Sequence, residues 1–192
     1  AVAYNKISWN PKYQVINNLD YEITQFLEKD SFKEDDLVIL WVGANDYLAY
    51  GWNTELDAKR VRDVISDSAN RMVLNGAKQI LLFNLPDLGQ NPSARSQKVV
   101  EAASHVSRYH NELLLNLTRQ LAPFNAQERL AIAGNPLLAQ AVASPMTRRS
   151  ASELNCEGKM FWDQVHPTTA VHAALSERAA TFIEREYEFI PQ

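Results

Sequence analysis

Apolar residues repeat in two distinct ways along this chain, and the two patterns predict where strands and helices lie. Residues 37–42 and 80–83 form continuous apolar runs, which are typical of parallel strands covered on both faces. Elsewhere apolar residues recur every three or four positions, the spacing of a helix with one buried face. The helices predicted in this way span about residues 19–27, 56–75, 96–121, 126–133 and 168–186, with a further turn or two over 137–142.

The order of these elements predicts an α/β fold, because a helix precedes each of the two strands. Asn75-Gly76 closes the second helix, since glycine readily adopts the left-handed conformation found at helix ends. The strands are too few, however, because sheets of this kind usually hold about four to six. Residues 2–7 and 12–16 are weak strand candidates, and at 121–125 two helical patterns meet where α/β order expects a strand. Part of the sheet is therefore missing from the prediction.

Length and composition limit the classes of protein that fit. The 192 residues are 46% apolar and 22% charged, with a net charge of −4. We therefore expect a single folded domain over residues 1–192 and no basic surface for nucleic acid. No apolar run reaches the roughly 18 residues that a membrane-spanning helix needs. The chain opens on Ala1, with neither an initiator methionine nor a signal-peptide pattern, which indicates a processed or truncated start.

The tetrapeptide Gly43-Ala44-Asn45-Asp46 directly follows the first predicted strand. Ligands in open α/β sheets bind at the carboxyl ends of strands, and the carboxamide of Asn45 could donate N–H bonds there to a developing oxyanion. An ordinary turn at the end of a strand explains the same residues, because Gly, Asn and Asp all favour turns. By itself this tetrapeptide leaves both interpretations open.

A second candidate is Asp163-Gln164-Val165-His166, just before the last predicted helix. A spacing of three within a turn can bring the carboxylate of Asp163 against one nitrogen of His166, leaving the other nitrogen to act as a base. The alternative is a helix-start motif in which Asp163 caps the helix and His166 is exposed. The remaining histidines lie within helical patterns and are expected to be structural: His105, His110 and His172.

Other kinds of chemistry lack support in the sequence. The one cysteine and four histidines show no metal-ligand spacing, and no glycine-rich phosphate loop is present, so no metal and no cofactor are expected. A serine nucleophile beside glycine at a strand-to-helix turn is also absent. Ser93, on the loop after the second strand, is a weak substitute. The other serines of a polar segment are expected in a loop: Ser144, Ser150 and Ser152.

Taken together, the two tetrapeptides resemble two sequence blocks of the GDSL or SGNH family of serine esterases, Gly-x-Asn-Asp and Asp-x-x-His. Residues 38–47, 84–92 and 161–169 are similar to one subgroup of that family, the secreted bacterial glycerophospholipid:cholesterol acyltransferases and related phospholipases. The resemblance covers almost the whole chain. It implies that Asn45 donates to the oxyanion, that His166 is the general base and acid, and that Asp163 orients His166.

The chain departs from the family in what it lacks. The Gly-Asp-Ser block that carries the family's nucleophile and the glycine of the second block are absent, so the resemblance implies that the nucleophile is not on this chain. The family also has a longer stretch, including a strand, where Pro123-Phe124 joins two helical patterns. The resemblance further implies that Cys156 pairs with a cysteine of that omitted stretch in the complete secreted protein.

We therefore expect one incomplete SGNH-hydrolase domain, a flavodoxin-like, three-layer α/β/α fold with a parallel sheet that lacks its amino-terminal strand and a middle segment. The resemblance implies a secreted bacterial lipase/acyltransferase that cleaves a glycerophospholipid acyl ester through a serine acyl-enzyme and transfers the acyl group to cholesterol or water. Its partners would be phospholipid and sterol substrates, with peripheral contact to lipid surfaces. Two alternatives stay open, a non-catalytic lipid-binding remnant without a nucleophile and an SGNH carbohydrate acetyl esterase.

Overall fold

The structure is a computed structural model that describes residues 3, 17–50, 54–121, 129–133 and 161–186. Within these residues helices and strands alternate for most of the chain, as α/β order requires. The elements are α1 (Leu19–Leu27), β1 (Leu37–Leu40), α2 (Ala44–Tyr50), α3 (Glu55–Leu74), β2 (Gln79–Phe83), the short 3₁₀ helix η2 (Leu88–Gln90), α4 (Pro92–Ser96), α5 (Val100–Leu121), β3 (Arg129–Ala133) and α7 (Thr169–Glu186).

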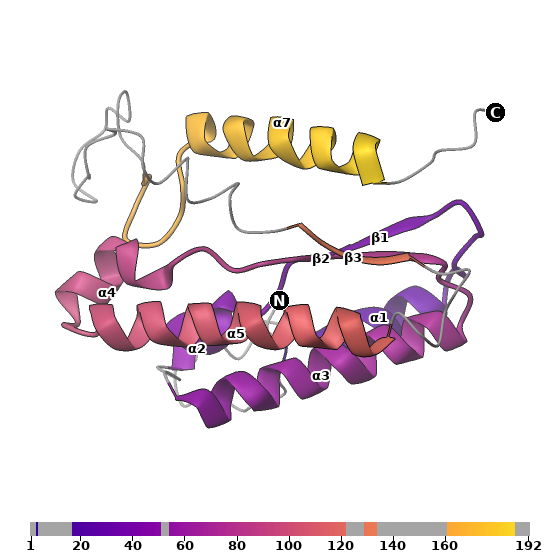
Figure 1. The fold of residues 1–192 in the computed structure, drawn as a ribbon, viewed down its shortest axis with the longest axis horizontal. Helices are drawn as coiled ribbons and strands as arrows, with labels where there is room; N and C mark the ends of the chain where they lie inside the picture. The colour runs from indigo at the N-terminus through magenta and orange to yellow at the C-terminus, as the bar shows by residue number, and fades with distance from the viewer. Residues whose placement is uncertain (1–2, 4–16, 51–53, 122–128, 134–160, 187–192) are drawn as a thin grey trace.

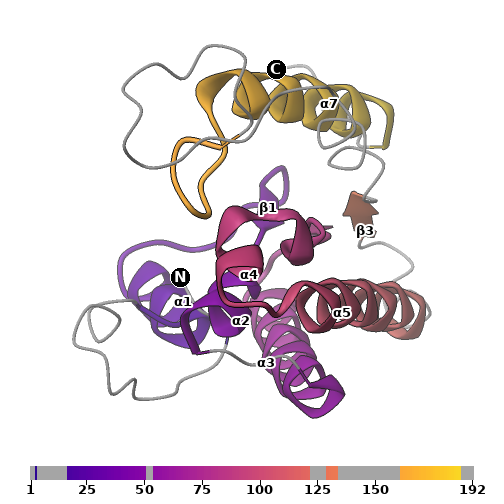
Figure 2. The same ribbon diagram turned by 90° about the vertical axis from the view of Figure 1, so that its left-hand side faces the viewer.

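The three described strands form a parallel sheet in the order β1-β2-β3. Val38 of β1 pairs with Ile80 of β2, and Ile80 pairs in turn with Leu130 of β3. The sheet lies between two layers of helix, with α7 on one side and α1, α3 and α5 on the other (Figures 1 and 2). All three strands therefore end at the same edge of the sheet, where active sites of such folds form.

Side chains of β2 alternate between the two helical layers, as the pleat of a strand requires. Ile80 and Leu82 belong to the larger core, which lies between the sheet and helices α3 and α5. Leu81 is fully buried on the opposite face, where Phe182 and Ile183 of α7 pack against it. The prediction of a strand covered on both faces is confirmed for β2.

The same prediction is wrong for β1. Ile39 is 49% exposed and Trp41, just after the strand, is 47% exposed. Both side chains lie on one face of the strand, whereas Val38 and Leu40 lie on the other face and pack against the larger core. Because Ile39 and Trp41 are apolar, this run resembled a fully buried strand, although on their face only Leu37, among the residues described, packs against Leu81.

The helix expected over residues 126–133 is wrong, because residues 129–133 form β3. The run Leu130-Ala131-Ile132-Ala133 is short and apolar, and periodicity alone cannot separate a short buried helix from a strand. Pairing with β2 over its whole length decides the outcome, since it gives the backbone of the run hydrogen-bonding partners. Residues 2–7, 12–16 and 137–142, and Pro123-Phe124, lie outside the described residues.

The helix expected over about 96–121 is confirmed as α5, which begins four residues later at Val100, and the short helix α4 precedes it where a loop was expected. Between them Lys98 adopts a φ of 58°, a left-handed conformation that interrupts a right-handed helix. The side chain of Asn91 begins α4 by accepting a hydrogen bond of 2.7 Å from the backbone N–H of Ala94, and Pro92 follows as the first helical residue. Asn-Pro is a recognisable helix-start pair, so this boundary could have been found in the sequence.

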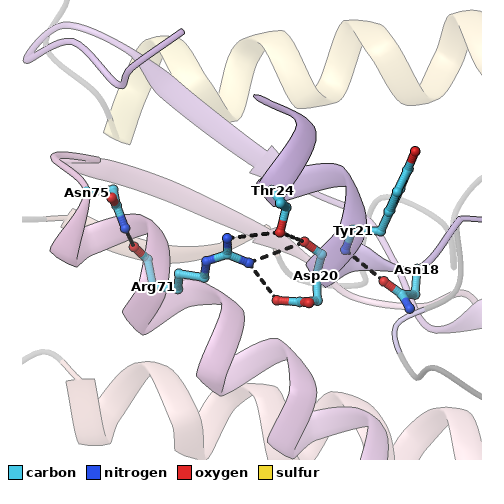
Figure 3. A network of polar contacts seen from close by, with 6 residues as sticks. All are labelled: Asn18, Asp20, Tyr21, Thr24, Arg71 and Asn75. Atoms are coloured by element: carbon cyan, nitrogen blue, oxygen red, sulfur yellow. Dashed lines mark hydrogen bonds and ion pairs between the residues drawn. The ribbon is translucent and has the colours of Figure 1, made fainter. Parts of the chain in front are cut away.

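A polar network holds α1 against α3 (Figure 3). The guanidinium of Arg71 on α3 donates 2.6 Å to Asp20 Oδ1 and 2.9 Å to Thr24 Oγ1, both on α1. Asn18 begins α1 by accepting from the backbone N–H of Tyr21 at 2.7 Å. The helices predicted over 19–27 and 56–75 are confirmed, and the network supports the layer beneath β1.

The turn at Asn75-Gly76 ends α3 as predicted. Gly76 has a φ of +102°, and the N–H of Ala77 donates to the carbonyl of Met72 at 3.0 Å, which is the pattern of a glycine-closed helix end. The last helix is confirmed as α7, with Val171 buried as expected, although Ala174 is exposed where it was expected inward.

Candidate active site

The turn after β1 carries the first candidate residue. Gly43 has a φ of +112°, a conformation that glycine adopts readily. The chain then enters α2 at Ala44, so a helix begins within this tetrapeptide. Asp46 is fully buried and accepts a hydrogen bond of 2.9 Å from the backbone N–H of Ala3. This arrangement places Asn45 at the carboxyl end of β1, in the first turn of α2.

The second candidate lies on a tight loop before α7. Phe161 and Pro167 form an isolated antiparallel bridge, and the N–H of Trp162 donates to the carbonyl of His166 at 2.7 Å. The carbonyl of Gln164 at the tip of the loop accepts from the N–H of Ser93 at 3.0 Å. The loop is therefore closed at its base and attached at its tip to the start of α4.

Asp163 and His166 form a hydrogen-bonded pair within this loop. Asp163 Oδ2 and His166 Nδ1 are 2.6 Å apart, and Asp163 Oδ1 accepts from the backbone N–H groups of Val165 and His166 at 2.8 and 2.7 Å. Partial burial alone would raise the pKa of Asp163, but these backbone bonds and the contact with His166 outweigh it and lower that pKa. The carboxylate is thus held ionised against one ring nitrogen.

The bond between the two side chains, rather than their exposure, favours a reactive role over a capping role. The side chain of His166 is 72% exposed, whereas that of Asp163 is 36% exposed. With Nδ1 occupied by Asp163, Nε2 is the ring nitrogen left for a substrate or a nucleophile. The geometry is that of a histidine base with an orienting carboxylate.

A cavity of about 360 Å³ joins the two candidates. Asn45 and His166 both line it, while Asp163 lies behind His166 and is not part of the lining. Most of the wall is apolar, with a few polar groups set into it, which is the usual composition of a small-molecule site. Its other lining residues are Trp41, Ala44, Leu48, Leu85, Pro86, Asp87, Leu88, Gln90, Asn91, Phe161, Val165, Pro167, Val171 and His172.

One wall of the cavity is the loop after β2, which α5 holds through three polar side chains. Asn111 accepts from the N–H of Leu85 at 2.8 Å and donates to its carbonyl at 2.9 Å. Ser107 accepts from the N–H of Leu88 at 3.1 Å, and Ser104 donates to Asp87 at 2.6 Å. Because 104, 107 and 111 share one face of α5, the helix fixes this wall along its length.

Sequence reasoning missed this wall and one histidine. His172 was expected to be structural, yet it is exposed and lines the cavity. It lies on α7 six residues after His166, so both histidines near the start of that helix reach the same space. The apolar period of α7 described its inward face and carried no signal for a polar group at the cavity.

His110 is structural, as predicted, and it pairs with a residue near the candidate turn. The imidazole is fully buried, and its Nδ1 lies 2.8 Å from the hydroxyl of Tyr47 on α2. Burial lowers the pKa of His110 to about 4. Burial and the nearby charges of Asp46 and Asp57 raise the pKa of Tyr47 well above its usual value. Both groups are therefore neutral near pH 7.

Ser93 does not line the cavity, and its hydroxyl accepts from Gln97 Nε2 at 2.6 Å. His105 is exposed on α5 and pairs with Glu55 at 3.2 Å. In the part of the chain that the structure describes, no three His, Cys, Asp or Glu side chains gather in a metal-binding group, and no helix is long and apolar enough to cross a membrane. Cys156 and the serines at 144, 150 and 152 lie outside the described residues.

Comparison with known proteins decides the family. Residues 3–179 match the model of the GDSL-like Lipase/Acylhydrolase family. The chain belongs to this family. It is 70% identical, over 99% of its length and 73% of the relative's, to a protein of Aeromonas hydrophila named phosphatidylcholine-sterol acyltransferase. The aligned stretch of 245 residues exceeds the 192 of this chain, so the relative carries residues within it that this chain does not have.

Two further proteins are more distant. An uncharacterised protein of the trpE-trpG intergenic region of Pseudomonas putida is 27% identical over 79% of this chain and 29% of its own length. The crystal structure of an acetyl xylan esterase, AlAXEase, superposes with a TM-score of 0.44 at 19% identity, covering 88% of this chain and 76% of that one.

Family membership confirms the resemblance found in the sequence, together with the α/β fold class and the class of serine esterase and acyltransferase. The three parallel strands between helical layers agree with that fold. The roles of Asn45, Asp163 and His166 stay predictions, which the geometry described above makes specific enough to test.

Proposed function

We propose that this chain is the larger part of a lipase/acyltransferase that cleaves an acyl ester of a glycerophospholipid and transfers the acyl group to a sterol or to water. The observation that carries the proposal is the shared cavity, which is mostly apolar and is lined by both Asn45 and His166. The 70% identity to a protein named phosphatidylcholine-sterol acyltransferase supports the choice of substrates.

In the proposed mechanism His166 moves the protons. Its Nε2 takes the proton of a nucleophilic serine as the serine oxygen attacks the acyl carbon, and then gives that proton to the departing lysophospholipid oxygen. A sterol hydroxyl or water repeats the two steps on the acyl-enzyme. Asp163 would keep Nδ1 protonated and would stabilise the imidazolium that exists between the two proton transfers.

Asn45 would stabilise the negative oxygen of each tetrahedral intermediate. Its carboxamide lies at the carboxyl end of β1 and lines the cavity beside His166, where an N–H donor is worth more than in water because the surroundings are apolar. The family's Gly-Asp-Ser block would supply the serine, and these 192 residues do not contain that tripeptide.

Lipid substrates fit the cavity wall better than carbohydrate substrates do. Leu48, Leu85, Leu88 and Val171 line it, so an acyl chain would be removed from water against apolar side chains. A sugar would leave the hydroxyl groups that face these four side chains without hydrogen-bonding partners, at a cost in free energy. This difference favours the lipase over the carbohydrate acetyl esterase.

We also propose that the cavity opens toward a lipid surface. Trp41 lines the cavity and is 47% exposed, and Trp162, next to the lining residue Phe161, is 56% exposed. Tryptophan favours the interface between lipid and water because its ring is both apolar and polar. Cosedimentation with phosphatidylcholine vesicles should weaken in Trp162→Ala, and unchanged binding would contradict this contact.

The decisive experiment uses the full-length protein, that is, the complete natural chain to which these 192 residues belong. Vesicles of phosphatidylcholine with a labelled acyl chain, with and without cholesterol, should yield labelled fatty acid and labelled sterol ester, and His166→Ala should abolish both products. His105→Gln, an exposed histidine outside the cavity, should leave both rates unchanged.

Each other outcome identifies a competing function. Vesicle binding without product would support a non-catalytic lipid-binding protein. Release of acetate from acetylated xylan, without release of long-chain fatty acid, would support the carbohydrate esterase. Recovery of the protein from the medium of its bacterial host would support secretion, which the resemblance to secreted acyltransferases leads us to propose.

A further inference from the structure

We propose that Tyr47 and His110 form a positioning pair that fixes the turn at Gly43 and, through it, the orientation of Asn45. The inference depends on the proposed function only for the role of Asn45. Neither residue lines the cavity, so neither is expected to touch substrate. Their effect would be exerted through the backbone that carries Asn45.

The pair joins two elements that are distant in sequence. Tyr47 lies on α2 and His110 lies on α5, 63 residues later, and the tyrosine hydroxyl is 2.8 Å from His110 Nδ1. Their rings meet edge to face, with centroids 5.7 Å apart and an interplanar angle of 84°. Tyr47 is 2% exposed and His110 is fully buried, so water does not compete for this bond.

His110 also contacts the turn directly. A Cβ atom on Gly43 would lie 2.9 Å from Cε1 of His110 and 3.3 Å from Cγ1 of Val61. The turn is therefore enclosed by α5 on one side and by α3 on another, with space for a hydrogen atom only. A shift of the imidazole would therefore change the space available to the backbone at Gly43.

Asn45 and Tyr47 point in different directions from α2. Successive residues of a helix are about 100° apart, so two residues separate the side chains by about 200°. Tyr47 thus reaches α5 while Asn45 faces the cavity. A helix of seven residues that is attached at Tyr47 by a directional bond cannot rotate about its axis without breaking that bond, and such a rotation would turn Asn45 out of the cavity.

Stability by itself gives no reason for a histidine at this place. Nε2 of His110 is buried with no hydrogen-bonding partner among the described residues, whichever ring nitrogen carries the proton. A buried donor or acceptor without a partner costs free energy, whereas two apolar side chains in place of the pair can be neutral or stabilising. The hydrogen bond between Tyr47 and His110 therefore contributes orientation more than stability.

The test compares three variants of the full-length protein: Tyr47→Phe, His110→Leu and the double variant. Tyr47→Phe keeps the ring and removes only the hydroxyl. Both single variants should lower kcat for phosphatidylcholine hydrolysis by about 10-fold to 100-fold, the range that a misplaced group costs, with KM within about twofold because the cavity wall is unchanged. In the double variant, resistance to urea should recover above that of the single variants, while kcat should stay low.

Leu117→Ala is the matched control. Leu117 is buried on α5 about two turns beyond His110, and its truncation leaves a cavity in the core without touching the turn at Gly43. It should lower resistance to urea and leave kcat unchanged. A double variant whose kcat recovers together with its stability would overturn the inference, and so would a loss of kcat in Leu117→Ala equal to that in Tyr47→Phe.

A second measurement separates this inference from the proposed function. The side-chain amide resonances of Asn45 in ¹H–¹⁵N spectra should move in Tyr47→Phe and stay in place in Leu117→Ala. If the unaltered full-length protein hydrolyses no lipid, the proposed function fails, and these resonances still decide whether the pair sets the placement of Asn45. Unmoved resonances in Tyr47→Phe would overturn the inference whatever the activity.

Discussion

Asp163 and His166 are joined twice, once through the backbone and once through the ring. Asp163 Oδ1 accepts from the backbone N–H of His166 at 2.7 Å, and Oδ2 lies 2.6 Å from Nδ1. One carboxylate therefore shapes the loop with one oxygen and orients the imidazole with the other. The two tasks can be separated by a substitution that keeps one oxygen and replaces the other.

Asp163→Asn makes that separation. The amide oxygen can still accept from the backbone N–H groups of Val165 and His166, so the loop should keep its shape. The amide nitrogen can only donate, and it would force His166 into the tautomer with the proton on Nε2. Lipid hydrolysis by the full-length protein should then fall by about 1,000-fold to 10,000-fold, as in serine hydrolases with the equivalent change.

The measurement is kcat for phosphatidylcholine hydrolysis together with urea unfolding of the same preparation. His105→Gln is the control, because His105 also contacts a carboxylate but lies on the exposed face of α5. Near-normal turnover in Asp163→Asn would show that the pair is a loop-shaping device with no role in catalysis.

Asn45→Ala tests the other side of the cavity. Removing one donor to an oxyanion costs about 100-fold to 1,000-fold in kcat in comparable enzymes, and the same loss is expected here. KM should change little, because a donor aimed at the tetrahedral oxygen acts in the transition state and not in the ground state. Gln90→Ala is a useful comparison, since Gln90 lines the same cavity from the opposite loop. A rise in KM at constant kcat in Asn45→Ala would assign Asn45 to substrate binding instead.

The candidate site could be found in the sequence because its geometry is local. Asp163 and His166 are three residues apart and meet within one loop, and Asn45 follows a strand whose apolar run is unmistakable. The pair of Tyr47 and His110 could not be found in this way, since 63 residues separate its members. No spacing rule connects two positions that only the packing of α2 on α5 brings together.

The fold was predictable to the same extent and for the same reason. In α1, α3 and α7 apolar residues recur at helical spacing, a local pattern that can be seen without knowing the tertiary structure. β3 has five residues and no period, so its identity as a strand depends on its neighbour β2. The break between α4 and α5 depends on one left-handed residue, Lys98, whose side chain carries no signal for that conformation.

Gly89 is expected to tolerate no side chain, although it is not in a left-handed conformation. A Cβ atom there would overlap the side chain of Ser104 and the backbone carbonyl of Val100, both on α5. The carbonyl cannot move away without disturbing the helix, so Gly89→Ala should lower the free energy of unfolding by about 1–3 kcal/mol, as overpacking usually does. It should also displace the cavity wall that Asp87 and Leu88 form.

Urea unfolding of Gly89→Ala beside Gly76→Ala would check this expectation. Gly76 has a φ of +102°, but the nearest atom to a Cβ there is 3.4 Å away. Its substitution therefore costs only the strain of the left-handed backbone, about 1–2 kcal/mol, and leaves the cavity intact. Equal activity in the two variants would mean that the loop after β2 does not shape the cavity.

The buried imidazole of His110 predicts how stability depends on pH. Its pKa falls from 6.5 to about 4 on folding because burial disfavours the charged ring. Between these values the unfolded chain binds a proton that the folded chain does not, so protons favour unfolding there and stability rises with pH. The free energy of unfolding should therefore increase by about 3 kcal/mol from pH 4 to pH 7 on account of this residue.

Urea unfolding at half-unit steps from pH 4 to pH 7.5 measures this dependence, with His110→Leu measured beside the unaltered protein. The leucine variant should lose the part of the slope that lies between about pH 4 and 6.5, whereas acid destabilisation from Asp163, whose pKa is lowered, should persist in both proteins at the acid end. Identical slopes in the unaltered protein and in His110→Leu would mean that folding does not lower the pKa of His110, which would contradict its burial as a neutral ring over this pH range.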